Sequence, residues 1–216
     1  MNPVILTLLP DYSNLTELAK KVSSLLKENK VGAIPTETFY GLACNPFSQK
    51  AVERLFYLKK RPPNKPIILL IGDIKQLFLV VEEIPPLGQI LIKAFWPGPL
   101  TIVFKAKKEV LSLLTANTGT IGVRFSSSII VREICQTFKL PITGTSANIS
   151  ETQPSRNIKE ILKELPEIDF VLDGGELKAQ APSTVISVVD NKLSLIREGM
   201  IPFNEIKKKV FEDSFL

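Results

Sequence analysis

The stretch Val31-Gly32-Ala33-Ile34-Pro35-Thr36-Glu37-Thr38 decides the fold of this chain. Its first half is short, apolar and closed by proline, which predicts a buried strand that ends in a polar turn. Before it, apolar residues recur with the helical period over residues 15–26, after a capping box expected at 14–17. After it, Ser48 is expected to cap a helix that runs to about residue 58. A buried strand between two helices indicates an α/β protein, in which functional sites lie at the ends of strands.

Further strands and helices are expected along the rest of the chain. An opening strand is expected within residues 1–10, and apolar runs predict strands at 67–71, 100–106, 121–125, 141–145, 170–173, 184–189 and 193–197. The helical period predicts helices at 73–81, 87–95, 129–138, 158–165 and 203–212. The strand–helix–strand order of the first half is typical of parallel pairing, and the tight Asp190-Asn191 connection is typical of antiparallel pairing. A mixed sheet flanked by helices is therefore expected.

The length and composition are sufficient for one sizeable core. The chain has 216 residues, of which 44% are hydrophobic, and no long linker divides it. We therefore expect a single domain over residues 1–216, with a core from about 12 to 201 and a C-terminal helix at 203–212. The 27 Lys and Arg against 22 Asp and Glu give a net charge of +5. This excess favours phosphate-bearing partners without requiring a nucleic acid.

The cysteines and the N-terminal residues indicate the cellular compartment in which the protein is expected. Cys44 and Cys135 are far apart and lack CxxC spacing, so neither a disulfide framework nor a zinc site is expected. The segment 1–10 lacks the basic leader and the small-residue cleavage site of a secretory signal. No apolar run in the sequence is long enough to span a membrane. These features predict a cytoplasmic protein without a membrane partner.

Three cations and a proline, Lys59-Lys60-Arg61-Pro62, end the second expected helix. Cations at a helix C-terminus complement the helix dipole, and this alone explains many such runs. Asn64-Lys65-Pro66 places another cation just before a buried strand, so Lys59, Arg61 and Lys65 are expected to converge on one cleft where an anion offsets their repulsion. Because the chain has no histidine, chemistry there would use fixed cations, hydroxyls, amides, carboxylates and a metal ion brought by the substrate.

Other polar groups follow expected strands. The segment Thr143-Gly144-Thr145-Ser146-Ala147-Asn148-Ile149-Ser150 can bind phosphate, ribose or carboxylate, although the same residues form ordinary turns. The segment 35–42 is either a cradle for a small molecule or a loop with Tyr40 in the core and its hydroxyl on a backbone group. Arg124 either lies on a solvated strand face or reaches a carboxylate, and Arg197 is equally open.

The standard nucleotide and hydrolase motifs are absent from the sequence, since it contains no GxxxxGK[ST], GxGxxG, HExxH or Ser-His-Asp set. Seven other motifs instead resemble, in order, the YrdC/TsaC family of L-threonylcarbamoyladenylate synthases over roughly residues 15–201. They are Pro35-Thr36-Glu37-Thr38-Phe39-Tyr40-Gly41-Leu42, Lys59-Lys60-Arg61-Pro62, Trp96-Pro97-Gly98-Pro99-Leu100-Thr101, Gly122-Val123-Arg124, Thr145-Ser146-Ala147-Asn148, Ser183-Thr184-Val185 and Leu195-Ile196-Arg197-Glu198-Gly199. The chain ends too soon for the extra C-terminal domain of two-domain relatives, so it resembles the short single-domain form.

The resemblance implies a twisted α/β fold with a large basic concave cleft. It also implies a nucleotidyltransferase that forms threonylcarbamoyl-AMP and pyrophosphate from L-threonine, bicarbonate and ATP. The product would supply the threonylcarbamoyl group of adenosine 37 in tRNA through separate transferase machinery, so the enzyme would meet tRNA only indirectly or weakly. Mg²⁺ would accompany ATP, and no protein side chain is expected to be a metal ligand.

By matching motifs, the resemblance also assigns site residues. The catalytic residues would be Lys59 and Arg61. The ATP-binding residues would be Arg61, Lys65, Thr120, Ser146, Asn148, Ser155 and Arg197. The threonine-binding residues would be Thr36, Thr38, Arg124 and Ser183. Such cations suit the reaction, because attack of a threonine carbamate on the α-phosphate joins two anions whose charge the protein must neutralise.

The chain departs from the family pattern at three places. Relatives commonly have one histidine where this chain has Leu69-Leu70-Ile71 and another where it has Ser126-Ser127-Ser128. Ser150-Glu151 stands where many members have Ser-Gly. Two alternatives therefore stay open, namely an RNA-binding module that uses the same cleft and a nucleotide-sensing relative without synthase activity.

Overall fold

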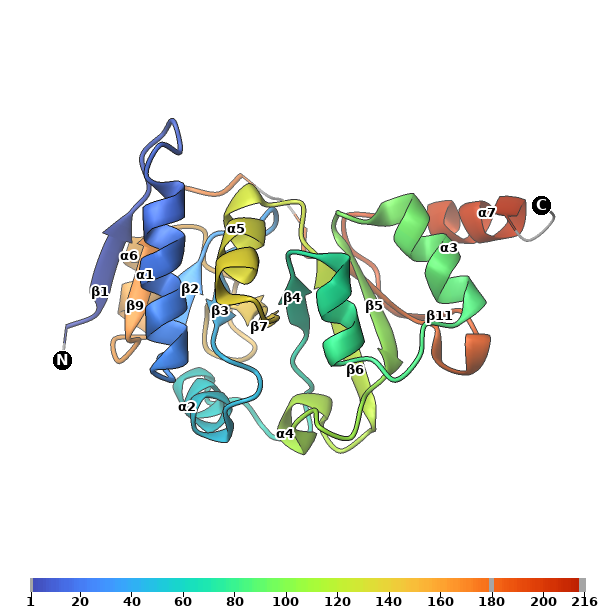
Figure 1. Cartoon of the computed structure of the whole chain (residues 1–216). Coiled ribbons are helices and arrows are strands. Elements are labelled where there is room, and N and C mark those ends of the chain that lie inside the picture. The colour runs from blue at the N-terminus through green and yellow to red at the C-terminus, as the bar shows by residue number, and fades with distance from the viewer. Residues whose placement is uncertain (1, 179–180, 214–216) are drawn as a thin grey trace.

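Two mixed β-sheets flanked by helices form the fold (Figure 1). The structure is a computed structural model, and it describes residues 2–178 and 181–213. The first sheet has the strand order β1-β9-β2-β3-β8, with the bounds Val4–Thr7, Phe170–Asp173, Gly32–Ile34, Gly41–Ala43 and Thr145–Ser146. The second has the order β11-β10-β5-β6-β4-β7, with the bounds Ser194–Arg197, Thr184–Ser187, Leu100–Lys105, Thr120–Phe125, Leu69–Ile71 and Ile142–Thr143. The predicted α/β class with parallel and antiparallel pairs is confirmed, but the strands form two sheets where one was expected.

Helices cover the sheets in separate groups (Figure 1). Helices α1 (Leu15–Lys27) and α5 (Ile129–Phe138) pack side by side, and α3 (Pro86–Phe95) packs against α7 (Phe203–Asp213) at the end of the second sheet. The remaining helical segments are α2 (Gln49–Lys59), α4 (Ser112–Thr115), α6 (Ile158–Glu164) and the 3-10 segments η1 (Ile74–Leu79) and η2 (Val189–Asn191). Within residues 2–178 and 181–213, none of these helices combines the length and the apolar character that crossing a membrane requires.

Side chains from both sheets contribute to each of the two hydrophobic cores. The larger core contains Leu42 of β3 in the first sheet and Phe104 of β5 in the second, both fully buried. The smaller core lies against α1 and α5 and joins Phe170 of β9 to Leu70 of β4. Burying a side chain of this size contributes about 1.5–3 kcal/mol. The shared cores therefore hold the two sheets in a fixed relation to each other.

The predicted strand at 141–145 is divided between the two sheets. Strand β7 pairs antiparallel with β4 in the second sheet, and β8 pairs antiparallel with β3 in the first. Gly144 lies between them, where a Cβ atom would stand 2.4 Å from the Leu70 side chain. Glycine is required because the backbone passes so close to its neighbour. The chain thus passes at Gly144 from the second sheet to the first, where Ser146 lies in β8.

The two predicted helix caps had different outcomes. Ser48 caps α2 as expected, since its side chain accepts a hydrogen bond from Ala51 N at 3.3 Å. The capping box at 14–17 was wrong. The Asn14 side chain accepts from Leu9 N and donates to Thr7 O, each at 3.0 Å, so it closes the loop after β1 instead of capping α1.

Short elements account for most of the remaining differences. Strand β4 covers only the last three residues of the predicted strand at 67–71, and the predicted helix at 73–81 is the 3-10 segment η1. Strand β3 has three residues and α4 has four. Neither is long enough to display a period of apolar residues, so the sequence pattern did not predict them.

Candidate functional site

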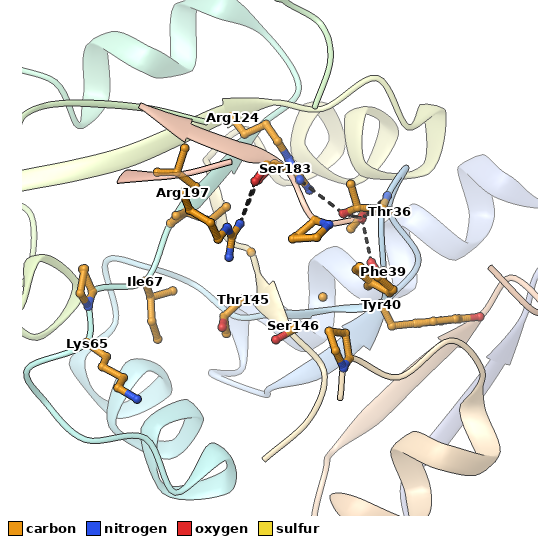
Figure 2. Close-up of a pocket in the computed structure, with 18 of the residues that line it drawn as sticks. Thr36, Phe39, Tyr40, Lys65, Ile67, Arg124, Thr145, Ser146, Ser183 and Arg197 are labelled. Carbon is orange, nitrogen blue, oxygen red and sulfur yellow. Dashed lines mark hydrogen bonds between the residues drawn. The ribbon is translucent and has the colours of Figure 1, made fainter. Parts of the chain in front are cut away.

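A cavity of about 420 Å³ opens between the two sheets (Figure 2). The first sheet contributes strand β8 and the turn that joins β2 to β3. The second sheet contributes side chains from β6, β10 and β11. The cations that line it are Arg61, Lys65, Arg124 and Arg197. A concave surface with this charge attracts anions.

The predicted site residues divide into two groups. Those that line the cavity are Thr36, Thr38, Arg61, Lys65, Arg124, Ser146, Ser183 and Arg197. Those that are not among its described lining residues are Lys59, Thr120, Asn148 and Ser155. The lining residues come from distant parts of the chain, and the two-sheet fold is what brings them together.

Arg124 is a buried cation that reaches a carboxylate, which decides between its two predicted positions. Its Nε lies 3.3 Å from Glu37 Oε1, and its Nη1 lies 3.4 Å from Thr38 Oγ1, to which it donates. Glu37 also accepts a short hydrogen bond from the Ser126 hydroxyl. Burial lowers the pKa of Arg124, and the Glu37 charge opposes this. The pair fixes the guanidinium at the cavity wall.

The turn after β2 is built around the Thr36 hydroxyl. Thr36 Oγ1 donates to Phe39 O at 2.7 Å and accepts from Thr38 N at 3.1 Å. It also lies 3.0 Å from Thr38 Oγ1, so the Thr38 hydroxyl donates to Thr36 and accepts from Arg124. A threonine that bonds its own backbone two residues further on sets such a turn locally. Thr36 therefore shapes the cavity wall, and Thr38 connects it to the arginine.

Tyr40 is among the residues that line the cavity, but its hydroxyl is used elsewhere. The hydroxyl donates to Gly175 O at 2.7 Å and accepts from Gly174 N at 3.0 Å. Burial raises the pKa of Tyr40 to about 12. The interpretation of Tyr40 as a packed residue with its hydroxyl on backbone groups is confirmed.

Arg197 projects from the edge strand β11 into the cavity (Figure 2). Its Nη2 donates to Ser183 O at 2.9 Å, and the Ser183 hydroxyl lies 2.9 Å from Thr101 Oγ1. Burial lowers the pKa of Arg197, and the charge of Arg124 lowers it further. Two arginines that share one wall repel each other unless an anion lies between them.

Arg61 and Lys65 line the cavity from the loop that follows α2. Lys60 ends α2 in the left-handed conformation, with φ of 48°, which turns the chain at this point. Arg61 then donates from Nε to Lys65 O at 3.0 Å and from Nη2 to Pro66 O at 2.6 Å. These bonds fix the loop, while the Lys65 ammonium pairs with Glu151.

Lys59, which was predicted to converge on the cleft with Arg61 and Lys65, is not among the described residues that line the cavity, and its catalytic role stays a prediction. Its ammonium donates to Ser146 O at 2.6 Å, Asn148 O at 2.9 Å and Asn148 Oδ1 at 3.1 Å. The side chain is fully buried, and burial followed by the charge of Arg61 lowers its pKa to about 7. Lys59 therefore holds the segment that carries Ser146 to the cavity, because two backbone carbonyls and the Asn148 side chain accept its three hydrogen bonds.

The three other predicted residues outside the lining have defined places. Thr120 begins β6, with its hydroxyl 2.8 Å from Thr118 Oγ1, whereas Arg124 lies near the other end of that strand. The Asn148 amide donates to Thr152 O at 2.7 Å. Ser155 is buried, and its hydroxyl has no hydrogen-bond partner among the described residues. Their roles in ATP binding stay predictions.

The sequence reasoning missed the parts played by Glu37 and Ser126. Glu37 orients Arg124, and Ser126 holds Glu37 and also accepts from Ser128 N at 3.2 Å. A carboxylate inside the polar turn after a buried strand was a usable signal, because a buried arginine requires an acidic partner. No pattern in the sequence indicated that Ser126 lies beside that turn.

Comparison with known proteins identifies the family. The family model Sua5/YciO/YrdC, described as "Telomere recombination", matches residues 24–199. The chain belongs to this family. The predicted resemblance is therefore confirmed.

The curated relatives include enzymes named for the predicted reaction. The threonylcarbamoyl-AMP synthase of Pyrococcus abyssi is 35% identical over 191 residues, which cover 88% of this chain and 56% of that protein. The putative threonylcarbamoyl-AMP synthase of Methanocaldococcus jannaschii is 35% identical over 204 residues, which cover 91% of this chain and 95% of that protein. The chain thus spans just over half of the first relative and nearly all of the second.

Solved structures show the same fold. P. abyssi Sua5 complexed with L-threonine has a TM-score of 0.89 at 32% identity, covering 95% of this chain and 60% of that chain. E. coli YciO has a TM-score of 0.85 at 25% identity, covering 94% of this chain and 99% of that chain. The second match spans nearly the whole of both proteins.

Proposed function

We propose that this chain is a threonylcarbamoyl-AMP synthase, which forms threonylcarbamoyl-AMP and pyrophosphate from L-threonine, bicarbonate and ATP. The observation that carries the proposal is the cavity between the sheets, where Arg61, Lys65, Arg124 and Arg197 converge with family-motif hydroxyls. Relatives 33–38% identical to the chain have this name. The activity is that of a nucleotidyltransferase, because the adenylyl group of ATP passes to a carbamate.

Arg124 and its neighbours would bind threonine. An arginine fork suits a carboxylate, and Arg124 is held beside Glu37 at 3.3 Å. The hydroxyls of Thr38 and Ser183 line the same cavity and offer further hydrogen bonds to the amino acid. The P. abyssi Sua5 neighbour was solved in complex with L-threonine, which supports an amino-acid site in this fold.

Arg61, Lys65 and Arg197 would bind the phosphates of ATP. Threonine and bicarbonate first give a carbamate and water, and a carbamate oxygen then attacks the α-phosphorus. The bond from that phosphorus to the bridging oxygen breaks, and pyrophosphate leaves with the electron pair. Attacking and leaving groups are both anions, so fixed cations lower the barrier by neutralising charge and holding the reactants in line.

Mg²⁺ would enter with ATP and be held by its phosphate oxygens, as magnesium commonly is. No three His, Cys, Asp or Glu side chains gather in the part of the chain that the structure describes. Near the cavity, the carboxylates of Glu37 and Glu151 are each paired with a cation. The metal would supply positive charge on the departing pyrophosphate. The product would pass to transferase machinery that modifies tRNA.

The test incubates the purified protein with ATP, Mg²⁺, bicarbonate and L-threonine. Released pyrophosphate and a threonine-dependent adenylate, identified by mass spectrometry, are the expected products. Omission of threonine is the control, and absence of a threonine-dependent adenylate would refute the proposal. RNA affinity with a steep salt dependence and no turnover would instead support the alternative RNA-binding module.

Arg61→Ala is a variant that tests the site itself. The guanidinium lines the cavity while bonding two carbonyls of its own loop. We expect at least a hundredfold loss of turnover, since one positioned charge commonly contributes about that factor to phosphoryl transfer. The far-UV circular dichroism spectrum should be unchanged. Turnover equal to that of the unmodified protein would mean that Arg61 only fixes its own loop through Lys65 O and Pro66 O.

A further inference from the structure

One of the cations that line the cavity already has an anion on it. The Lys65 ammonium makes a short ion pair with Oε1 of Glu151. Lys65 lines the cavity, whereas Glu151 is not among the described lining residues. In Figure 2 the Lys65 side chain lies at the margin of the cavity, well separated from the Arg197 guanidinium, which points into it. Glu151 therefore already neutralises the charge of Lys65 at the edge of the cavity.

The backbone presents Glu151 at a fixed place. Ser150 N donates to Lys59 O at 2.9 Å, and the Asn148 amide donates to Thr152 O at 2.7 Å, so hydrogen bonds hold the loop on both sides of Glu151. Glu151 itself has φ of 76°, in the left-handed region that favours glycine. A residue with a side chain is thus kept at a position where glycine fits better.

The ion pair can open at little cost. The Lys65 and Glu151 side chains are 40% and 77% exposed. Exposed pairs of this kind contribute about 0–1 kcal/mol to stability, so an incoming polyphosphate with several negative charges can displace one carboxylate. The Lys65 backbone does not need to move, because Arg61 holds it through Lys65 O at 3.0 Å. Only the lysine side chain changes its partner.

We propose that Glu151 is a counter-ion of Lys65 that competes with the polyphosphate of the nucleotide and thereby sets nucleotide affinity. This inference rests on the proposed function, because it assigns Lys65 to the phosphates of ATP. The carboxylate leaves Lys65 when ATP binds and returns when pyrophosphate leaves. Glu151 is in this sense a specificity-determining residue, since it disfavours ligands with too little negative charge to replace it.

The test compares nucleotide affinity in matched variants. Binding of Mg·ATP and of inorganic pyrophosphate is measured by isothermal titration calorimetry without threonine or bicarbonate, so that no turnover occurs. Glu151→Gln removes the charge and keeps the length of the side chain. It should lower the dissociation constants of both ligands about fivefold. Circular dichroism confirms that the variant is folded.

Asp190→Asn is the matched control. Asp190 also has a positive φ, of 53°, and pairs with Lys105 at 3.1 Å as an exposed carboxylate. It is not among the described residues that line the cavity. We expect Asp190→Asn to leave both affinities unchanged. A similar gain in both variants would mean that net charge alone is responsible, and it would overturn the inference.

Removal of Lys65 tests whether Glu151 acts through it. In a Lys65→Met protein, adding Glu151→Gln should change neither affinity, because Glu151 then has no ion pair with Lys65 that the ligand must break. A fivefold gain in that background would overturn the proposal. If the unmodified protein binds ATP but Glu151→Gln does not bind it more tightly, the inference fails and the proposed function stands. If the unmodified protein does not bind ATP, both fail.

The carboxyl group of Glu151 gives a second, direct readout. The hydrogen bond from Lys65 lowers the pKa of Glu151 in the free protein. Displacement by pyrophosphate should raise that pKa toward its ordinary value, as measured by an NMR titration of the isotopically labelled carboxyl. A pKa that stays lowered when the ligand is bound would contradict the exchange, whatever the affinities are.

Discussion

Two ion pairs flank the same cavity and differ in burial. In the pair of Arg124 with Glu37 the side chains are 4% and 13% exposed, whereas in the pair of Lys65 with Glu151 they are 40% and 77% exposed. Removing one partner of a buried pair leaves an uncompensated charge in a poorly solvated place, while water takes over from a lost exposed partner. The first pair is therefore a fixed part of the wall, and the second is an exchangeable part of the edge.

The largest expected effect comes from breaking the buried pair. Glu37→Gln leaves the Arg124 guanidinium without its carboxylate, so we expect the free energy of unfolding to fall by about 3 kcal/mol. Urea unfolding followed by circular dichroism measures it. Glu151→Gln serves as the comparison in the same experiment. Equal losses in the two variants would contradict the distinction between a fixed and an exchangeable pair.

A second expected effect concerns the dependence of stability on pH through Lys59. Burial lowers the pKa of Lys59 to about 7, whereas the unfolded lysine keeps its usual pKa of about 10.4. Between these values the unfolded state binds more protons, so stability rises with pH. The contribution should be about 2 kcal/mol between pH 7 and pH 9.

Lys59→Met is the variant that isolates this contribution. It keeps a side chain of similar length without a titratable group, so its free energy of unfolding should lack the rise that Lys59 gives the unmodified protein over this range. Urea unfolding of both proteins at a series of pH values measures the difference. If the free energy of unfolding changed with pH in the same way in both proteins, Lys59 would not be the group whose pKa is lowered by burial.

A smaller effect is expected from the support behind the buried pair. Ser126 donates to Glu37, so Ser126→Ala should cost about 1 kcal/mol of stability and raise the KM for threonine more than that for ATP. The neighbouring Ser127 is exposed, and Ser127→Ala is the matched control. A change of the two KM values by the same factor would mean that Ser126 supports the fold and not the orientation of Arg124.

The smallest expected effect is on the stability of the exposed pair. Glu151→Gln should lower the free energy of unfolding by no more than about 1 kcal/mol. Thermal unfolding at low and high salt measures it, and the difference from the unmodified protein should shrink as salt screens the charges. A loss comparable with that of Glu37→Gln would show that the pair holds the loop in place and is not free to exchange.

The sequence predicted what depends on regular patterns. The periodic spacing of apolar residues predicted most of the helices and the longer strands, and the order of seven motifs predicted the family. The pattern failed where a single close contact decides the path, as at Gly144, where the chain crosses between sheets against Leu70. Strand β3 was missed because three residues are too few to show a period.

For the candidate site, the sequence predicted which residues are polar but not which way each one points. Two cations two residues apart, Lys59 and Arg61, have different surroundings, since the first is surrounded by carbonyls and the second lines the cavity. The turn at Lys60 causes the difference. Glu37 was overlooked as the partner of Arg124 because the two are far apart in the chain, and only the fold brings them together.

The most direct test of the central claim follows the carbon of bicarbonate. The protein is incubated with isotopically labelled bicarbonate, L-threonine, Mg²⁺ and ATP, and the adenylate is analysed by mass spectrometry. The account predicts a threonylcarbamoyl-AMP that carries the label in its carbamoyl group and forms only when threonine is present. An adenylate without the label, or one that forms equally well without threonine, would contradict it.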